Sequence, residues 1–271
     1  MEELIIRAAT IADIPGICHV NRGEEGPWAE MESCAAWVVN RIRLGFYVQV
    51  AELDGRIIAH GEWSLSDERR WKTFYLGQLQ VDPDFQFRGV GRRMLADGIR
   101  VARAAGCDSI SLIPEQDTGS QKFYEKCGLA RGNDILRCRL GAEAGPVQGE
   151  RVSEAPQSVI KRLPFMFGLS QTSAYHMWQV LNRRPEGEGR RVDTLLGDGF
   201  CLQIAGFTRS RSAQLLVWAE RDSAAEMIRR ARAFAWELGY PGVDFYFFPE
   251  YRTLFPAGLT STWDYEMYMR L

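Results

Sequence analysis

The 271-residue sequence lacks a long hydrophobic run, a strong net charge and any metal-binding spacing of cysteines. No apolar stretch approaches the ~20 residues that a membrane-spanning helix needs. Acidic residues occupy the N-terminus, where a signal peptide carries positive charge. A formal net charge of −2 gives no basic footprint for nucleic acid. We therefore expect a cytoplasmic protein, a monomer or homodimer, that binds neither membranes nor nucleic acid.

Cysteine is also sparse, with six residues and no Cys-x-x-Cys pair. This spacing predicts no metal site, and a chain of this length builds a core without disulfides. We expect six reduced thiols. Lysine is scarcer still, since arginine supplies 29 of the 33 basic residues. That bias is typical of a GC-rich genome and is only weak support for anion binding.

The hydrophobic pattern of residues 4–140 predicts strands alternating with helices. Thr10 and Asp13 form a Thr-x-x-Asp cap before the first helix, and Asp54-Gly55 predicts a tight hairpin. The expected strands are 4–8, 46–53, 56–65, 73–81, 109–113 and 134–140, and the other expected helices are 33–44, 92–105 and 120–126. The pattern predicts an α/β (α+β) fold.

The second half repeats the first. Residues 141–150 are small and polar, as in a linker. Beyond them, a strand–helix–strand pattern recurs at an offset of 135 residues, from Val81 and Leu216 onward, and both halves end in Arg-Leu. We interpret this as a tandem duplication, with domains at 1–140 and 151–271. The alternative is that two unrelated strand–helix–strand units look alike.

Residues 79–95 carry the most informative motif, in which a strand ends, the chain turns and a helix begins beside Gly89 and Gly91. Unpaired N–H groups at a helix start bind anions, and a diphosphate fits such a site. Met94 breaks a dinucleotide fingerprint, and no Lys-Ser or Lys-Thr follows the glycines as a P-loop requires. A Gln-x-x-Gly-x-Gly motif remains. The alternative is a capped helix with incidental glycines.

A second motif, Ser120-Gln-Lys-Phe-Tyr-Glu-Lys-Cys-Gly-Leu129, follows about 35 residues later. With the entrance Ile6–Thr10, these two motifs resemble the GCN5-related N-acetyltransferase (GNAT) superfamily over residues 4–140. The resemblance implies the acyl-CoA N-acyltransferase fold, a mixed and mostly antiparallel sheet flanked by helices, here in two tandem copies. It also implies acetyl-CoA as co-substrate and a small-molecule primary amine as acceptor.

The same resemblance assigns roles to residues. Tyr124 is expected to protonate the departing thiolate. The main chain of Leu79, Gln80 and Val81 is expected to pair with the pantetheine arm. The pyrophosphate is expected to bind Gln86, Phe87, Arg88, Gly89, Val90, Gly91 and Arg92. Asp117 stands where the family usually has asparagine, which puts one coenzyme contact in doubt.

The general base is not defined by the resemblance, because Gln78 and Gln80 occupy the strand where many members place a carboxylate. Strict alternation along residues 56–65 puts His60, Glu62 and Ser64 on one face, which we expect to be solvated. Glu62 is one candidate base and Glu115 is another. A water relay is an equal alternative.

On the acceptor side, the loop 21–32 contains Trp28 and four glutamates that would favour a cationic amine: Glu24, Glu25, Glu30 and Glu32. The alternative is a solvated charged loop.

In the second half, Arg221, Ala224 and Glu226 replace Gln86, Gly89 and Gly91, and Ser223 and Glu226 predict a capping box. We therefore expect a degenerate copy that does not bind the coenzyme. His176 and Trp178 are expected to pack rather than to act in catalysis. Two alternatives for the whole chain are transfer of another acyl group, or to a thiol-biosynthetic amine, and an acyl-CoA-binding module without turnover.

Overall fold

The computed structural model describes residues 4–22, 24, 28, 30–66, 72–115, 119–168, 190–207, 213–247, 252–253 and 260–271. The strands of the first half are β1 (Leu4–Ala8), β2 (Tyr47–Leu53), β3 (Arg56–Ser66), β4 (Thr73–Val81), β5 (Ser109–Leu112) and β6 (Ala130–Gly141). Its helices are η1 (Ile11–Asp13), α1 (Ile14–Val20), α2 (Met31–Arg43), η3 (Pro83–Phe85), α3 (Val90–Ala104) and α4 (Ser120–Lys126). The predicted elements are confirmed, with ends that differ by a few residues.

The second half has the same kind of elements. Its strands are β7 (Glu150–Val152), β8 (Phe165–Phe167), β9 (Arg190–Gly197), β10 (Phe200–Phe207), β11 (Ala213–Ala219), β12 (Gly242–Phe247) and β13 (Thr260–Arg270). Its helices are α5 (Gln157–Arg162), η4 (Arg221–Ser223) and α7 (Ala224–Glu237). His176 and Trp178, which are expected to pack, lie outside the described residues.

All but one of these strands follow a single path in the order β1-β2-β3-β4-β5-β13-β6-β12-β11-β10-β9-β7, and β8 pairs with β11 beside it. Only β4–β5 and β11–β12 are parallel pairs along this path, so the sheet is mixed and mostly antiparallel, as predicted. The order reads the same from both ends when each first-half strand is exchanged for its second-half counterpart. This symmetry supports the tandem duplication.

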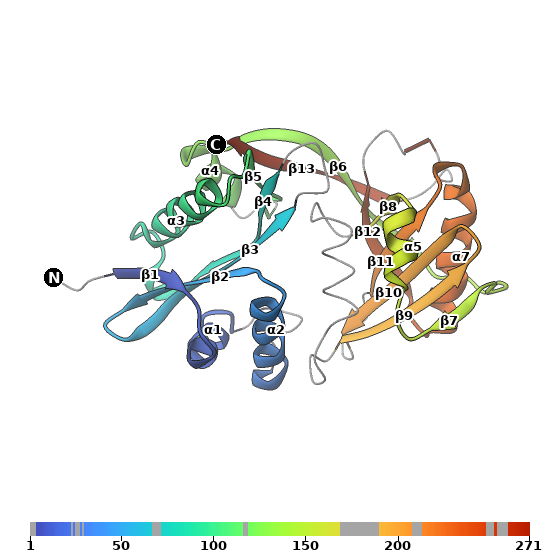
Figure 1. Cartoon of the computed structure of the whole chain (residues 1–271), viewed down its shortest axis with the longest axis horizontal. Helices are drawn as coiled ribbons and strands as arrows, with labels where there is room; N and C mark the ends of the chain where they lie inside the picture. The colour runs from blue at the N-terminus through green and yellow to red at the C-terminus, as the bar shows by residue number, and fades with distance from the viewer. Residues whose placement is uncertain are drawn as a thin grey trace.

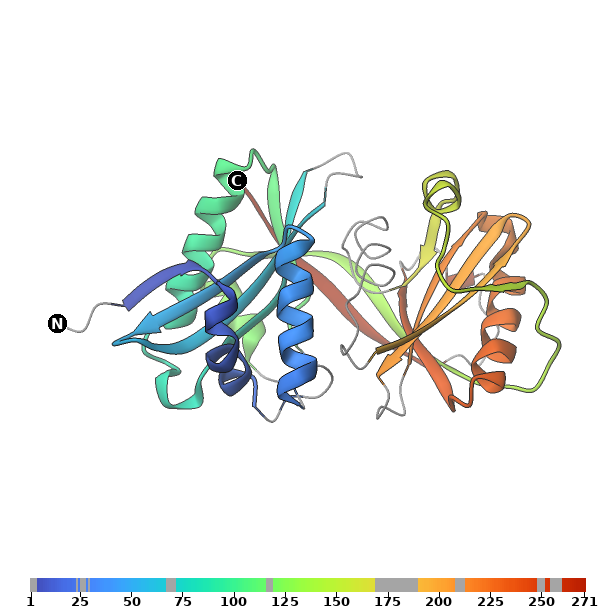
Figure 2. The same cartoon turned by 60° about the horizontal axis from the view of Figure 1, so that its bottom comes forward.

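The last strand of each half pairs across the centre of the sheet. β13, from the end of the chain, lies between β5 and β6, whereas β6 pairs with β12 of the second half. Figures 1 and 2 show β6 and β13 running side by side between the two lobes. The two pairings are equivalent. Leu112 of β5 pairs with Met267 of β13, and their counterparts, Phe247 of β12 and Leu136 of β6, pair with each other. The division at 141–150 stays a prediction.

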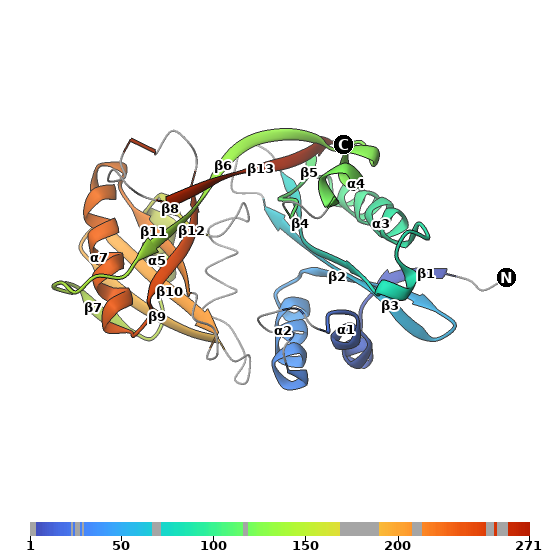
Figure 3. The same cartoon turned by 180° about the vertical axis from the view of Figure 1, so that it is seen from behind.

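Helices cover both faces of the first-half sheet, as the view from behind also shows (Figure 3). On one face, Ile17 of α1 and Val38 of α2 pack against Val50 of β2. On the other, Leu95 of α3 and Tyr124 of α4 pack with Trp63 of β3. The site described below uses side chains from both faces.

The expectation of six free thiols is wrong for two cysteines. Cys18 of α1 and Cys34 of α2 form a disulfide, with their Cα atoms 6.0 Å apart. Cys107, Cys127, Cys138 and Cys201 are free. Spacing along the chain did not reveal the pair because packing of α1 against α2 brings the two cysteines together.

Candidate active site

Strand β4, which carries the predicted coenzyme residues Leu79–Val81, separates from its parallel neighbour β5. β3 pairs with β4 along its whole length, and Gly77 is the extra residue of a bulge opposite Glu62 and Trp63. Within the described part of the chain, β5 pairs with β4 only at Thr73–Tyr75. The edge of β4 at Leu79–Val81 that faces away from β3 therefore has no partner strand among the described residues. An extended ligand could add there like a strand, although the Gln86 amide already occupies the Val81 carbonyl.

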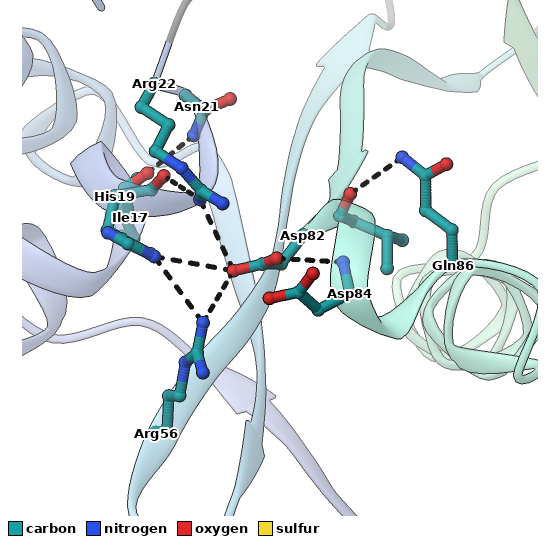
Figure 4. A network of polar contacts seen from close by, with 9 residues as sticks. Ile17, His19, Asn21, Arg22, Arg56, Asp82, Asp84 and Gln86 are labelled. Carbon is teal, nitrogen blue, oxygen red and sulfur yellow. Dashed lines mark hydrogen bonds and ion pairs between the residues drawn. The ribbon is translucent and has the colours of Figure 1, made fainter.

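Asp82, the first residue after β4, is fully buried and holds the turn that follows (Figure 4). Its carboxylate accepts hydrogen bonds from the Asp84 backbone at 3.1 Å, Arg22 at 3.3 Å and Arg56 at 2.9 Å. Burial by itself raises the pKa of Asp82, but these hydrogen bonds and the arginine charges lower it overall. The Gln86 amide donates to the carbonyl of Val81 at 3.1 Å. Gln86 thus fixes the turn rather than facing solvent freely.

The N-terminus of α3 opens directly from this turn. Gly89 adopts φ +83°, a left-handed conformation that glycine tolerates. The first intrahelical bond runs from the N–H of Arg93 to Gly89, so the N–H groups of Val90, Gly91 and Arg92 lack helical acceptors. Unpaired N–H groups at a helix start are the geometry that binds anions, and the 15-residue helix α3 presents three of them.

Four side chains around the loop refine the sequence expectation. Phe87 is wholly exposed and holds φ +60°. Arg88 and Arg92 are exposed beside the helix start. The Arg93 guanidinium instead donates to the carbonyl of Leu4 at 2.8 Å, so it ties α3 to β1.

The structure joins the two predicted motifs. A Cβ added to Gly91 would lie 3.4 Å from the ring of Phe123, so α4 packs close to the start of α3. Tyr124 follows Phe123, with ring centroids 4.9 Å apart, and is 9% exposed. No hydrogen-bond partner for its hydroxyl is found among the described residues. Burial raises the pKa of Tyr124, so the phenol keeps its proton.

On the opposite face of the sheet, the expectation of a solvated surface is wrong. His60 and Glu62 are 0% and 5% exposed, because α1 and α2 cover this face of β3. Glu62 pairs in register with Gln78 of β4, one strand away from where a carboxylate was expected. Its Oε1 accepts from Trp37 Nε1 at 2.8 Å, and its Oε2 lies 3.8 Å from Arg41 Nε.

Asn21, at the end of α1, connects this cluster to β4. Its Nδ2 lies 2.8 Å from the carbonyl of Ile17 and 3.1 Å from His60 Nδ1. Its Oδ1 accepts from Gln78 Nε2 at 2.7 Å. The sequence analysis missed Asn21, Trp37 and Arg41, since nothing local distinguishes them. Only their convergence on His60 and Glu62 does.

The remaining predicted site residues are less central. Glu115 is exposed beyond the end of β5, and its carbonyl accepts a hydrogen bond from the Ser120 hydroxyl.

In the loop 21–32, Glu24 lies 3.4 Å from the Gln80 amide, which places it beside β4. Trp28 packs against His60 with centroids 5.3 Å apart rather than facing solvent. Glu30 and Glu32 are exposed, whereas Glu25 and Asp117 lie outside the described residues.

The corresponding turn of the second half is shorter. Residues 82–89 connect β4 to α3, but only residues 220–223 connect β11 to α7. The predicted capping box is wrong, because the Ser223 hydroxyl donates to the carbonyl of Glu220. Glu226 pairs instead with Arg229 and with Arg230, the latter at 2.7 Å. Neither side chain therefore accepts a hydrogen bond from the backbone N–H groups at the start of α7.

The described residues contain neither a metal-binding cluster nor a helix that could span a membrane. No group of three or more His, Cys, Asp or Glu side chains in that part of the chain is arranged to hold a metal ion. No helix among those residues is both long and apolar enough to cross a bilayer.

Comparison with known proteins agrees with this geometry. Residues 10–129 match the family model "Acetyltransferase (GNAT) family". A tandem GNAT protein from the clavulanic acid biosynthesis pathway superposes with a TM-score of 0.65 at 16% identity, covering 100% of this chain and 98% of that one. A GCN5-related N-acetyltransferase from Kribbella flavida gives 0.63 at 13% identity, covering 100% and 71%. No curated protein sequence matches.

A third structure, a Pyrococcus horikoshii protein that is itself only proposed to be an acetyltransferase, gives a TM-score of 0.68 at 16% identity, covering 99% of this chain and 89% of that one. The whole chain thus has the fold of tandem GNAT structures. The first half of the chain, over residues 10–129, is a domain of the GNAT acetyltransferase family.

Proposed function

We propose that the protein transfers an acetyl group from acetyl-CoA to the primary amine of a small molecule. The observation that carries the proposal is the open edge of β4, which leads to the free N–H groups of α3 and ends beside Tyr124. Pantetheine would pair with Leu79–Val81, and the pyrophosphate would bind the loop 86–92. Arg88 and Arg92 add charge at its mouth.

The reaction proceeds by direct attack. The amine nitrogen adds to the thioester carbonyl carbon, the carbon–sulfur bond breaks, and the thiolate takes the proton of the Tyr124 phenol. The nitrogen gives its proton to Glu62, so the products are an amide and free coenzyme A. Tyr124 suits this role by its position, because it packs in the same cluster as Leu79 of β4, and its buried phenol holds a proton before sulfur leaves.

Glu62 is the better candidate base of the two. It lies opposite Gln78 on the face where α1 and its following loop approach β4, and its carboxylate is fixed by the donors around it. Glu115 is exposed at the far end of β5 and shares none of these contacts. Glu24, next to Gln80, would favour a cationic amine as the acceptor.

The second half would not bind the coenzyme. Its turn before α7 is short, and the Glu226 carboxylate occupies the first turn of that helix. The half would instead contribute β13 and β12 to the shared sheet.

The test combines acetyl-CoA with a panel of primary amines, and mass spectrometry detects the amide. Tyr124→Phe should lower kcat by about 10²–10⁴-fold, the range of general acids. Its affinity for coenzyme A, measured by calorimetry, should not change. Tyr240→Phe is the matched control, because burial also raises the pKa of Tyr240 in the second half. Its kcat should equal that of the wild type.

Other results would lead elsewhere. Unchanged kcat in Tyr124→Phe removes the general acid from the mechanism. Coenzyme binding without an acetylated product from any amine, at any pH tried, favours an acyl-CoA-binding module. Faster turnover with a longer acyl-CoA favours transfer of another acyl group.

A further inference from the structure

We propose that His60 is a positioning residue, a neutral imidazole whose protonated Nε2 lies beside the carboxylate of Glu62. The inference deepens the acetyl transfer proposed above and rests on it, since Glu62 is there the group that takes the proton of the amine. The structure assigns the imidazole proton to one nitrogen through a chain of contacts that begins at a backbone carbonyl.

The chain of contacts starts at Ile17, whose carbonyl can only accept. Asn21 must therefore point its Nδ2, the donor, towards that carbonyl at 2.8 Å. With Nδ2 placed in this way, Asn21 Oδ1 accepts from Gln78 Nε2 at 2.7 Å. The second hydrogen of Nδ2 meets His60 Nδ1 at 3.1 Å. His60 Nδ1 is consequently the acceptor, and its proton is on Nε2.

His60 Nε2 lies close to the carboxylate of Glu62. His60 is fully buried, and Nε2 makes no hydrogen bond within the described residues. It lies 3.5 Å from Glu62 Oε1, the oxygen that also accepts from Trp37 at 2.8 Å. The same carboxylate oxygen thus accepts a hydrogen bond from the Trp37 indole and lies near the imidazole Nε2.

The surroundings of His60 keep the imidazole neutral. Among the described residues, the charged groups near it are Glu62 on its own strand and, beyond Glu62, Arg41 of α2. Trp28 covers its ring, Asn21 caps it from α1, and Gln80 is its uncharged partner on β4. Burial lowers the pKa of His60 to about 3. An imidazole that stays neutral at working pH orients Glu62 and does not exchange protons with the amine.

Two substitutions of His60 distinguish the contribution of Nε2 from that of Nδ1. The amide nitrogen of glutamine reaches the place of imidazole Nε2, whereas asparagine reaches only the place of Nδ1. His60→Gln should keep kcat within about twofold. His60→Asn should lower kcat about tenfold, the low end for a partner that acts through another residue, with the KM for acetyl-CoA unchanged. In a Glu62→Gln background, His60→Asn should cause no further loss.

Equal losses in His60→Gln and His60→Asn, or an additive loss in the Glu62→Gln background, would overturn the assignment. A pH profile of kcat with a limb that disappears in His60→Gln would also overturn it, because His60 would then be the group that titrates.

Long-range proton–nitrogen NMR of the wild-type protein tests the tautomer without turnover. The chain has three histidines, so the spectrum of His60→Gln identifies the His60 signals. The expected pattern is the Nε2–H tautomer, unchanged from pH 8 to pH 5. An Nδ1–H tautomer, or protonation above pH 5, contradicts the inference. If no amine is acetylated but the tautomer is as expected, the proposed function fails and the geometry of His60 stands.

Discussion

Gly89 shows what a single residue contributes to the coenzyme site. Its φ of +83° starts α3 in the left-handed region, and a Cβ built there meets no atom within 4 Å. A side chain at this position therefore strains the backbone without clashing with the protein. What it would meet is the ligand, since the free N–H groups of Val90–Arg92 begin directly after it.

We predict that Gly89→Glu abolishes coenzyme A binding in calorimetry while the protein stays folded. The strain of a left-handed non-glycine residue is about 1–2 kcal/mol. Gly45→Glu is the matched control, because Gly45 has φ +80° and equally open space but follows α2. Both variants should lose similar stability, and only Gly89→Glu should lose affinity. Retained affinity in Gly89→Glu would remove the basis of the pyrophosphate assignment.

At the scale of elements, the pairing of α1 with α2 supports the proposed base. Cys18 and Cys34 join the two helices covalently. Asn21 lies one turn beyond Cys18, and Trp37 lies one turn beyond Cys34. The two residues that contact His60 and Glu62 are therefore carried by helices that the disulfide holds together.

We predict that reduction of this disulfide lowers the free energy of unfolding by about 3 kcal/mol, the value for closing a loop of roughly 15 residues. Urea denaturation with and without a dithiol reductant measures the change. The Cys18→Ala/Cys34→Ala double variant should not respond to the reductant. Alkylation in denaturing urea without reductant should label four cysteines, and labelling of all six would contradict the prediction.

At the scale of the whole molecule, the two halves depend on each other. β13 lies between β5 and β6, and Met267 packs in the same core cluster as Tyr124 and Leu129. The backbone N–H of Leu271 donates to Asp108. The end of the chain thus completes the sheet that carries the coenzyme site.

We predict that Met267→Ala lowers the free energy of unfolding by about 2–5 kcal/mol, as expected for a large buried side chain. Met267 is 0% exposed, whereas the next residue, Tyr268, is 39% exposed. Tyr268→Ala on the same strand should cost within about 0.5 kcal/mol. Thermal and urea unfolding measure both. Equal effects would show that β13 does not support the first-half core.

The sequence alone determined the elements of the first half, the phosphate-binding turn and the helix that carries Tyr124. These are local features, because periodicity, glycine positions and caps act within a few turns of chain. It also indicated the duplication, since a copied pattern keeps its register.

Only the tertiary structure decided the rest. The exchange of β6 and β13, the Cys18–Cys34 disulfide and the burial of His60 and Glu62 all depend on segments far apart in the chain. Alternation places His60 and Glu62 on one face of a strand but does not say what covers that face. Packing of α1 and α2 over β3 turned an apparently solvated surface into the candidate base and its positioning residue.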